Sequence, residues 1–503
     1  MAIKKYVATK DNTITNGFGL NISTRKTGSN MGASDILEIY SVYAQQTTAS
    51  AELSRVLIEF PISSVSADRS AGSIPASGSV SFFLRMFNAR HSEQLPRDFT
   101  VNVLAVSQSW QEGTGLDMEG YSDESHSLIA GSNWMSASQT TAWQKVGGDY
   151  HSASYVADIP STTMPNYTFT FKKGNEDILL DVTSAVEEWI AGRQPNYGFG
   201  VFLTASQEGY VSNSSGLDVD PILHNVEGAQ KSFYTKRFFS RSSEFFFKKP
   251  SLEARWDSTI KDDRGYFFSS SSMAPAADNL NNLYLYNYIR GRLVDIPHSE
   301  TVTVNLHASS NGLPSGASLA QATAAKIKTG VYKAQLTINT TSSLLHDIWS
   351  GSVGGVYKTG SIAVNNFNDD SVLFSDDYTS FTSNITNLKP RYLNDEIARF
   401  RVFTRPRNFK PTIYTVASTD LQKTIIPSAS YEVRRSIDNE VVIANSTSSV
   451  TQHTYLSYDN SGSYFDLDMS LLEPGYMYAI RLFFHNSNGW RQQKEEFNFR
   501  VEQ

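Results

Sequence analysis

The chain contains no cysteine among its 503 residues. That absence excludes disulfide bonds, thiolate metal sites and cysteine nucleophiles. Charged residues are also scarce, at 18% of the chain, against roughly 25% in a typical soluble domain. The net charge is −7 and the basic residues are scattered, whereas a nucleic-acid-binding protein needs a clustered basic face. We therefore expect no nucleic-acid partner.

Long apolar runs are absent as well. No stretch approaches the length that crosses a bilayer, and the residues after Met1 lack the long apolar region of an export signal. These absences predict a protein that is made in the cytosol and has no membrane partner. If it later faces the outside, it does so after cell lysis or on a particle.

Sequence motifs of common enzymes are missing too. The chain has no G-x-S-x-G elbow, no H-E-x-x-H pair and no glycine-rich phosphate loop. Its nine histidines lack the i, i+4 or His-x-His spacing that favours a metal site. We expect a protein that is not an enzyme and that needs no cofactor.

Carboxylates form several short clusters, all in turn-like surroundings. The clusters are Asp117-Met118-Glu119, Asp123-Glu124, Asp218-Val219-Asp220, Asp369-Asp370, Asp376-Asp377 and Asp466-Leu467-Asp468. A glycosidase needs two facing carboxylates, and the sequence does not show which of these acids face one another. Two clusters, at 218–220 and 466–468, could hold a structural calcium, but neither belongs to a complete twelve-residue calcium loop. Solvated loops are the favoured interpretation.

Strand-like alternation dominates the residues that are present. Apolar and polar side chains alternate in RVLIEF (55–60), SFFLRMF (81–87) and TVTVNLH (301–307). Turn-forming residues interrupt these runs at short intervals, which is typical of β-sandwiches and not of βαβ repeats. The length also exceeds what one hydrophobic core serves. We predict an all-β, multi-domain chain.

Two stretches have helical spacing instead. Residues 181–190 carry an apolar stripe, with Asp181 or Thr183 as the cap and Gly192 as the end. Residues 342–349 form a weaker candidate, with apolar residues three and four positions apart.

Composition divides the chain into four parts. Residues 1–32 are rich in Asn and Gly and suggest an arm that orders against a neighbour. A jelly-roll-like β-sandwich is expected at 33–256, with a turn-rich insertion at 209–230. Immunoglobulin-like β-sandwiches are expected at 257–400 and 401–503, the last of them immunoglobulin- or fibronectin-like.

The first sandwich carries an ordered set of motifs. They are RVLIEF (55–60), WQEG (110–113), WQKVGGD (143–149), DVT (181–183), WIAG (189–192), QPNYGFG (194–200) and FFSR (238–241). This order resembles the DNRLRE-type β-sandwich, a jelly-roll fold akin to carbohydrate-binding modules. The resemblance implies a binding or structural domain, and the insertion at 209–230 departs from it in a way that could abolish a sugar site.

Three tryptophans of this segment are the candidate site residues. Trp110, Trp134 and Trp143 could form a platform on which a sugar ring stacks, or a surface that contacts another protein. The alternative is that they pack in the core or at the end of the sandwich, and packing is favoured because buried tryptophan is commoner.

The end of the chain carries a second signature. LEPGYMYAI (472–480) matches the tyrosine corner of immunoglobulin and fibronectin-type sandwiches, in which a tyrosine hydroxyl bonds to nearby backbone. An arm, a DNRLRE-type sandwich and tandem immunoglobulin-like domains together resemble virion structural proteins of large tailed phages.

The leading hypothesis is therefore a structural protein of a tailed-phage virion, on the capsid, neck or tail. Its partners would be other virion proteins and copies of itself in a homo-oligomer or symmetric assembly. The alternative is an adhesin or receptor-binding module with a glycan partner. A depolymerase is disfavoured because neither a β-helix repeat nor an acid pair is evident.

Overall fold

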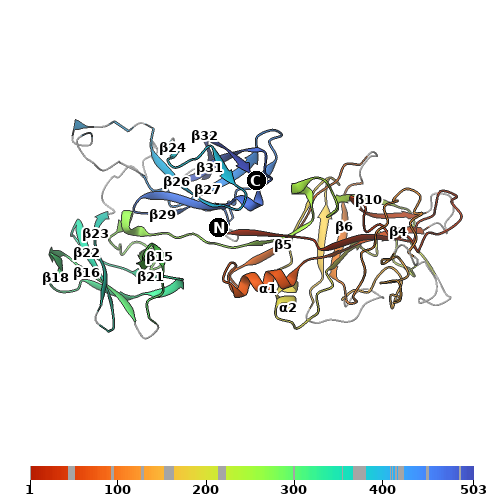
Figure 1. Cartoon of the computed structure of the whole chain (residues 1–503), viewed down its shortest axis with the longest axis horizontal. Coiled ribbons are helices and arrows are strands. Elements are labelled where there is room, and N and C mark those ends of the chain that lie inside the picture. The colour runs from red at the N-terminus through yellow and green to blue at the C-terminus, as the bar shows by residue number, and fades with distance from the viewer. Residues whose placement is uncertain are drawn as a thin grey trace. The chain divides into compact units, whose positions relative to one another are not determined.

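The computed structural model describes residues 2–43, 51–91, 96–125, 130–151, 164–212, 223–297, 301–353, 355–365, 381–407, 409–410, 412–413, 416, 424–448, 452–486 and 489–503. The chain divides into two compact units that meet between Trp256 and Asp257, which is where the sequence placed its first domain boundary. Nearly all regular structure in both units is β-strand (Figure 1). The predicted all-β fold class, a set of β-sandwiches, is confirmed.

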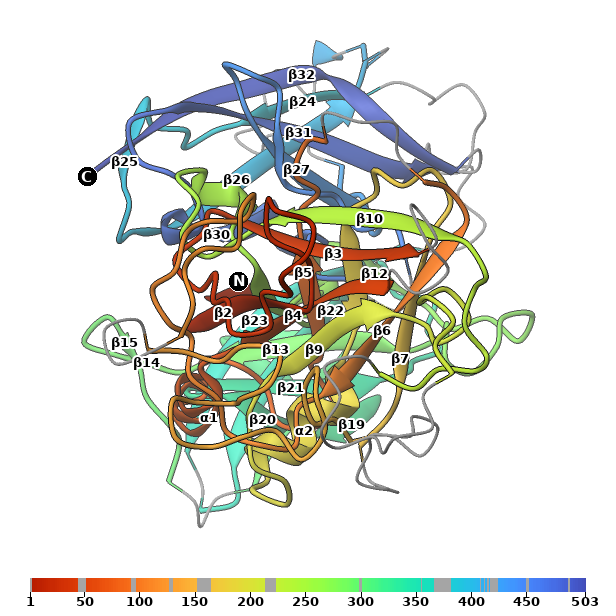
Figure 2. The same ribbon diagram turned by 90° about the vertical axis from the view of Figure 1, so that its right-hand side faces the viewer.

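Two antiparallel sheets form the first unit, residues 2–256. One has the order β1 (Ile3–Val7), β11 (Ser251–Arg255), β5 (Ser81–Met86) and β8 (Ile178–Asp181). The other has the order β10 (Ser232–Phe239), β3 (Ile36–Tyr43), β4 (Ala51–Glu59), β9 (Phe199–Leu203), β6 (Phe99–Ala105) and β7 (Tyr167–Phe171), with β2 (Lys10–Thr15) paired to β4. Figure 2 looks onto this larger sheet.

The larger sheet is buried on both faces. Along β4, Val56 and Ile58 point into the core between the two sheets. Leu53 and Leu57 point the other way, into a second core that the loops between residues 106 and 150 cover. Because successive strand residues face opposite sides, a strand with two covered faces is apolar at nearly every position.

The predicted N-terminal arm at 1–32 is wrong. Strand β1 pairs with β11 and β2 pairs with β4, so this segment belongs to both sheets. Its asparagines are polar but buried, and backbone groups satisfy them. Asn12 donates to Ser132 O at 2.9 Å and Asn16 accepts from Leu53 N at 2.6 Å. A polar composition predicts exposure only where the polar groups have no internal partner.

Two short helices close one end of this sandwich (Figure 2). Helix α2 (Thr183–Ile190) is the predicted one: Asp181 accepts the Thr183 N–H at 2.9 Å, and Gly192 follows with φ +69°. Helix α1 (Ile62–Ser70) was missed, because only Ile62 and Val65 of its nine residues are buried apolar ones. Arg69 of α1 and Glu187 of α2 form a two-bond ion pair at 2.6 and 2.7 Å. The 3-10 turn η1 (Phe246–Lys248) precedes β11.

The second unit begins with a middle sandwich. One sheet has the order β12 (Phe267–Phe268), β23 (Val356–Asn365), β22 (Leu344–Gly351), β16 (Val302–His307) and β19 (Ala320–Thr323). The other has the order β13 (Asn281–Tyr286), β21 (Val331–Leu336) and β20 (Ala325–Lys328). Two hairpins, β14 (Tyr288–Ile289) with β15 (Arg292–Leu293) and β17 (Ser309–Asn311) with β18 (Leu313–Ser315), extend from it.

A last sandwich completes the second unit. Its sheets have the orders β24 (Phe381–Ile385), β26 (Ile397–Pro406), β30 (Gly462–Asp468), β29 (Ser457–Asp459), and β25 (Arg391–Leu393), β32 (Gly489–Glu502), β31 (Met477–Asn486), β27 (Ala429–Arg435), β28 (Val441–Ile443). The predicted tyrosine corner is confirmed, since Tyr478 donates to Glu473 O at 2.7 Å.

Two predictions for this unit are wrong. Residues 342–349 contain no helix, because β22 alternates buried Leu345, Asp347 and Trp349 with more exposed neighbours. The boundary near residue 400 falls inside β26, which pairs with β24 on one side and β30 on the other. Pro406 had suggested a break, but it is only the last residue of that strand.

The entry segment of this unit pairs with the last sandwich before it reaches the middle one. Tyr458 of β29 donates its N–H to Ile260 O and accepts the Asp262 N–H, at 2.9 and 3.0 Å. The next residues form the 3-10 turn η2 (Asp263–Gly265), and β12 follows. A further 3-10 turn, η3 (Met469–Leu471), follows β30.

Candidate binding site

Several of the motifs that carry the family resemblance meet in the second core of the first unit, whereas DVT (181–183) and WIAG (189–192) contribute Val182 and Trp189 to the first core. Arg55, from RVLIEF, is fully buried and donates to both carboxylate oxygens of Glu208 at 3.2 Å. Its guanidinium also donates to Gly147 O at 3.2 Å and lies 5.5 Å from the Trp134 ring centre. A Cβ on Gly147 would lie 3.0 Å from Trp134. These motif residues therefore pack the fold and do not face a ligand.

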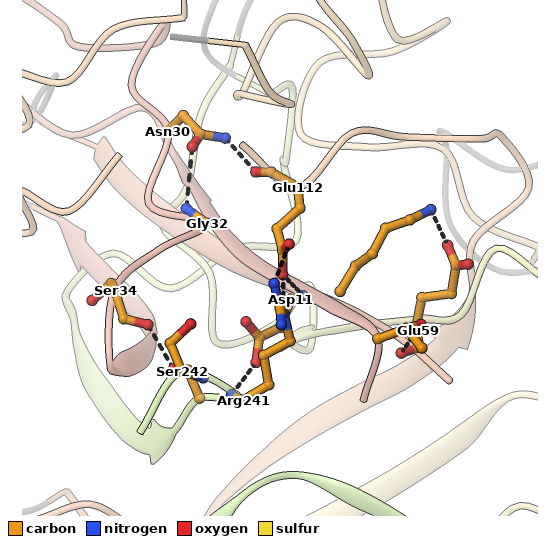
Figure 3. Close-up of polar contacts among 11 residues, drawn as sticks. Asp11, Asn30, Gly32, Ser34, Glu59, Glu112, Arg241 and Ser242 are labelled. Atoms are coloured by element: carbon orange, nitrogen blue, oxygen red, sulfur yellow. Dashed lines mark hydrogen bonds and ion pairs between the residues drawn. The ribbon is translucent and has the colours of Figure 1, made fainter. Parts of the chain in front are cut away.

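A second pair of motifs meets through an ion pair. Glu112, from WQEG, bonds through both carboxylate oxygens to Arg241, from FFSR, at 2.6 Å for the Oε2 bond (Figure 3). Glu112 Oε1 also accepts the Asp11 N–H at 2.9 Å, and Asn30 donates to Glu112 O at 2.7 Å. The network ties β2 and the loop before β3 to two loops that are distant in the sequence.

Asp11 is the unusual member of this network. Its Oδ2 accepts the Arg241 N–H at 2.6 Å, while its Oδ1 is buried without a hydrogen-bond partner in the described part of the chain. Burial raises the pKa of Asp11 to about 7, and the charge of Glu112 adds to the rise. Since Asp11 is only 1% exposed, its carboxyl group cannot reach a dissolved substrate, and its role is structural.

The three candidate tryptophans are core residues. Trp110, Trp134 and Trp143 are 2%, 0% and 5% exposed. The Trp110 indole donates to Tyr197 O at 2.9 Å, and the Trp143 indole donates to Asn133 O at 2.8 Å. None of them presents a ring face to solvent, so the sugar platform expected as one alternative is not formed by these residues.

The acidic clusters serve turns and ion pairs. Asp117 accepts bonds from the backbone of residues 119, 120 and 122 and from the Ser122 hydroxyl, which lower its pKa to about 2. Asp466 pairs with Arg399 at 2.7 and 2.9 Å, and Asp468 caps Ser470 N at 2.9 Å. The clusters at 218–220, 369–370 and 376–377 lie outside the described residues.

Neither a metal site nor a membrane-spanning helix is found in the described ranges. Within them, no three His, Asp or Glu side chains are grouped as a metal site would require. Within the same ranges, none of the helices has the length and apolar character needed to cross a bilayer.

A pocket of about 560 Å³ lies at the helical end of the first unit. It is lined by the turn between β1 and β2, the end of β4, and both helices. The polar side chains in its wall are those of Thr9, Lys10, Glu59, Ser63, Ser66 and Asn196, and Trp189 supplies an aromatic edge.

Some polar groups of this wall form hydrogen bonds within the protein, and others have no partner among the described residues. Lys10 Nζ bonds to Glu59 Oε2 at 2.9 Å and lies 5.6 Å from the Trp110 ring centre. Asn196 donates to Phe60 O at 2.9 Å, so its amide shapes the turn. The Trp189 indole N–H is buried and has no acceptor among the described residues. The pocket can offer hydroxyls and a charge pair to a hydroxyl-rich ligand, with Trp189 in its wall.

The sequence motifs include only some of the residues that line this pocket. Trp189 and Asn196 lie in the family-like motifs, although neither was assigned to a site. Lys10 and Glu59 were not singled out, since their pairing follows from the register of β2 on β4, which sets Lys10 opposite Glu59. No sequence signal gives that register in advance.

Comparisons with known proteins give little beyond the fold. No family model matches the chain, and no curated protein matches it. Solved structures similar to it include a titin A168–A169 fragment (9% identity, 47% of this chain and 94% of that one, TM-score 0.15). The chicken CNTN1 FN1–FN3 domains are 10% identical, over 54% of this chain and 82% of that one, with a TM-score of 0.15. The Yersinia pseudotuberculosis adhesin InvE is 11% identical, over 46% of this chain and 61% of that one, with a TM-score of 0.15. At such TM-scores these matches carry no argument about function.

Proposed function

We propose that this chain is a structural component of a tailed-phage virion and acts through protein–protein contacts. The supporting observation is an apolar strip on the middle sandwich. Its members are Tyr288, Ile289, Val294 and Ile327, which are 60%, 52%, 38% and 47% exposed. The first three belong to one hairpin or directly follow it, and exposed apolar groups on neighbouring residues are typical of surfaces that a partner covers.

The strip lies on a hairpin and on the strand at the edge of a sheet. Tyr288 and Ile289 form β14, and Ile327 lies in β20, the outer strand of its described sheet. Asp295 holds the two together, since it accepts Gly330 N at 2.7 Å and Lys326 Nζ at 2.6 Å. An edge strand carries unpaired backbone groups beside these side chains, which favours pairing with another chain.

The kind of particle is taken from the sequence resemblance to virion proteins of large tailed phages. In this proposal, the strip is covered by another protein of the same particle. Capsid, neck and tail are all consistent with the strip.

The test is mass spectrometry of purified particles together with immunogold labelling. A stoichiometric copy number at one fixed location is expected, and absence from the particle would contradict the proposal. Ile289→Ser with Ile327→Ser should lower incorporation while the free protein stays folded. Met273→Ser is the control, because Met273 is 94% exposed and lies outside the strip.

A second candidate function is glycan binding at the pocket of the first unit. The observation that favours it is the combination of Trp189 with hydroxyl and carboxylate groups in one hollow. Ser63→Tyr should fill the pocket and abolish binding on a glycan array, whereas Ser64→Tyr, one residue along α1 and outside the lining, should leave it unchanged. An array without any signal for the unaltered chain would exclude this candidate.

A further inference from the structure

Lys236 is a fully buried amine in the first unit. It lies in β10, with no exposed surface, and its Nζ is 4.6 Å from the Phe171 ring centre and 5.1 Å from that of Phe238. A lysine is rarely buried to this extent, because its charged form loses the solvation that water provides. Burial accordingly lowers the pKa of Lys236 to about 8.

The amine lies directly against an asparagine side chain. Lys236 Nζ donates to Asn88 Oδ1 at 2.7 Å, and also to Gly174 O at 2.9 Å and Glu176 O at 2.8 Å. A C=O bond is about 1.2 Å long, so Asn88 Cγ lies within about 4 Å of Nζ. That separation is close to the distance at which a nucleophile attacks a carbonyl carbon.

Two carboxylates adjoin the pair. Asp177 Oδ1 accepts the Asn88 backbone N–H at 2.8 Å. Glu176 Oε1 accepts the Lys172 and Lys173 backbone N–H groups at 2.9 and 2.7 Å, whereas its Oε2 is buried and has no hydrogen-bond partner among the described residues. Both carboxylates act electrostatically on Lys236, and general acid–base catalysis needs one such group to move a proton from the amine to the amide. The Phe171 and Phe238 rings keep water away from Lys236 Nζ.

We propose that Lys236 and Asn88 become joined by an amide bond that the folded chain forms without another enzyme. The unprotonated Nζ attacks Asn88 Cγ, the Cγ–Nδ2 bond breaks, and one proton moves from Nζ to Nδ2. The products are the Nζ–Cγ amide and one molecule of ammonia. No oxidant or reductant takes part, and the buried amide would not be hydrolysed back by water.

The bond would tie the two sheets of the first sandwich together. Lys236 belongs to β10 in the larger sheet, whereas Asn88 follows β5 of the smaller one. In a chain without cysteine, such a cross-link would limit the unfolded state in the way that a disulfide does. It would not depend on the redox state of the surroundings. This inference does not rest on the proposed virion role.

Intact mass spectrometry of the full, denatured chain tests the proposal. The expected mass is that of the sequence less one ammonia, and digestion should yield one branched peptide that contains both Asn88 and Lys236. A chain with the full sequence mass, or one without the branched peptide, would overturn the inference.

Two variants separate this reaction from loss of ammonia elsewhere, as in succinimide formation at an asparagine. Lys236→Met and Asn88→Ala should each have the full mass of their sequence, without loss of ammonia. The control Lys231→Met, just before β10, should still be lighter than its sequence by one ammonia. Ammonia loss that persists in Lys236→Met would contradict the proposal. If that variant does not fold, the branched peptide of the unaltered chain decides the question alone.

Discussion

Tyr458 donates a 2.6 Å hydrogen bond to Asp263, and this bond joins the last sandwich to the segment that enters the middle one. The other carboxylate oxygen of Asp263 accepts the Asn282 N–H at 2.7 Å, at the start of β13. One buried carboxylate thus holds three elements of the second unit. Burial raises its pKa, and the hydrogen bonds from Tyr458 and Asn282 oppose that rise.

Replacing this tyrosine should weaken the second unit. In Tyr458→Phe the buried carboxylate loses one of its donors, which costs about 1–3 kcal/mol. Urea unfolding of the full chain, followed by a signal from the second unit, should show a lower midpoint. Tyr455→Phe is the matched control, because the Tyr455 ring packs on Trp490 and no described hydrogen bond uses its hydroxyl. Equal midpoints for both variants would contradict this role of Tyr458.

The ion pair of Arg264 and Asp347 should contribute far more than a surface pair. Its two bonds measure 2.6 and 2.8 Å, both side chains are buried, and Trp349 donates a further bond to Asp347. Asp347→Ala leaves the Arg264 charge buried and unpaired, so a loss of about 3–5 kcal/mol is expected.

The matched comparison for that variant is Asp466→Ala. Asp466 makes a similar two-bond contact with Arg399, but the two side chains are 26% and 45% exposed. An exposed pair contributes about 0–1 kcal/mol. Similar losses from Asp347→Ala and Asp466→Ala in calorimetric or urea unfolding would show that burial does not set the difference.

The sequence could predict features that depend on neighbours along the chain. Helix α2 follows from a short apolar stripe and a following Gly192, and its N-cap residue is Val182, not the predicted Asp181 or Thr183. The corner at Tyr478 follows from the Pro474-Gly475 turn just upstream of it. Both are decided by residues within one or two turns of each other, and both are present.

Features that depend on distant partners could not be predicted in this way. Asn12 is buried because Ser132 lies beside it, 120 positions away. Residues 342–349 form a strand because Asp347 finds Arg264 in the core, which offsets the cost of burying a carboxylate. The pocket depends in the same way on the register of β2 on β4. In each case the sequence predicts that a polar residue is exposed, because its partner in the fold is not visible from the sequence.

The stability of the first unit should depend on pH through Asp11. Its pKa is about 7 when folded and near the usual 3.8 when unfolded, so the folded state holds the proton between these values. The stability that this proton contributes is complete below about pH 4 and is lost as the pH rises through 7. Asp11→Asn should remove this dependence, which amounts to about 1.4 kcal/mol for each pH unit between the two pKa values.

The measurement compares urea midpoints of the two proteins at pH 5 and pH 8. The stability of the Asp11→Asn variant, relative to that of the unaltered chain, should increase as the pH rises. Asp117→Asn is the contrasting variant, because Asp117 has a lowered pKa of about 2 and stabilises the folded state above its unfolded value. It should be less stable than the unaltered chain by the same amount at both pH values. A difference between Asp11→Asn and the unaltered chain that stays constant with pH would contradict the assignment.

Gly200→Ala should disrupt the second core by steric overlap alone. A Cβ on Gly200 would lie 2.1 Å from the Tyr150 ring, which is fully buried and packs at a tilt against Phe202. Overpacking of a closed core costs about 1–3 kcal/mol or more, so the thermal midpoint should fall. Gly192→Ala is the control: nothing lies within 4 Å of its Cβ, and only its φ of +69° opposes the change, at about 1–2 kcal/mol. Because the overlap is with one ring, adding Tyr150→Leu to Gly200→Ala should recover part of the lost stability. A double variant that is less stable than the sum of the two single changes predicts would argue against this contact as the cause.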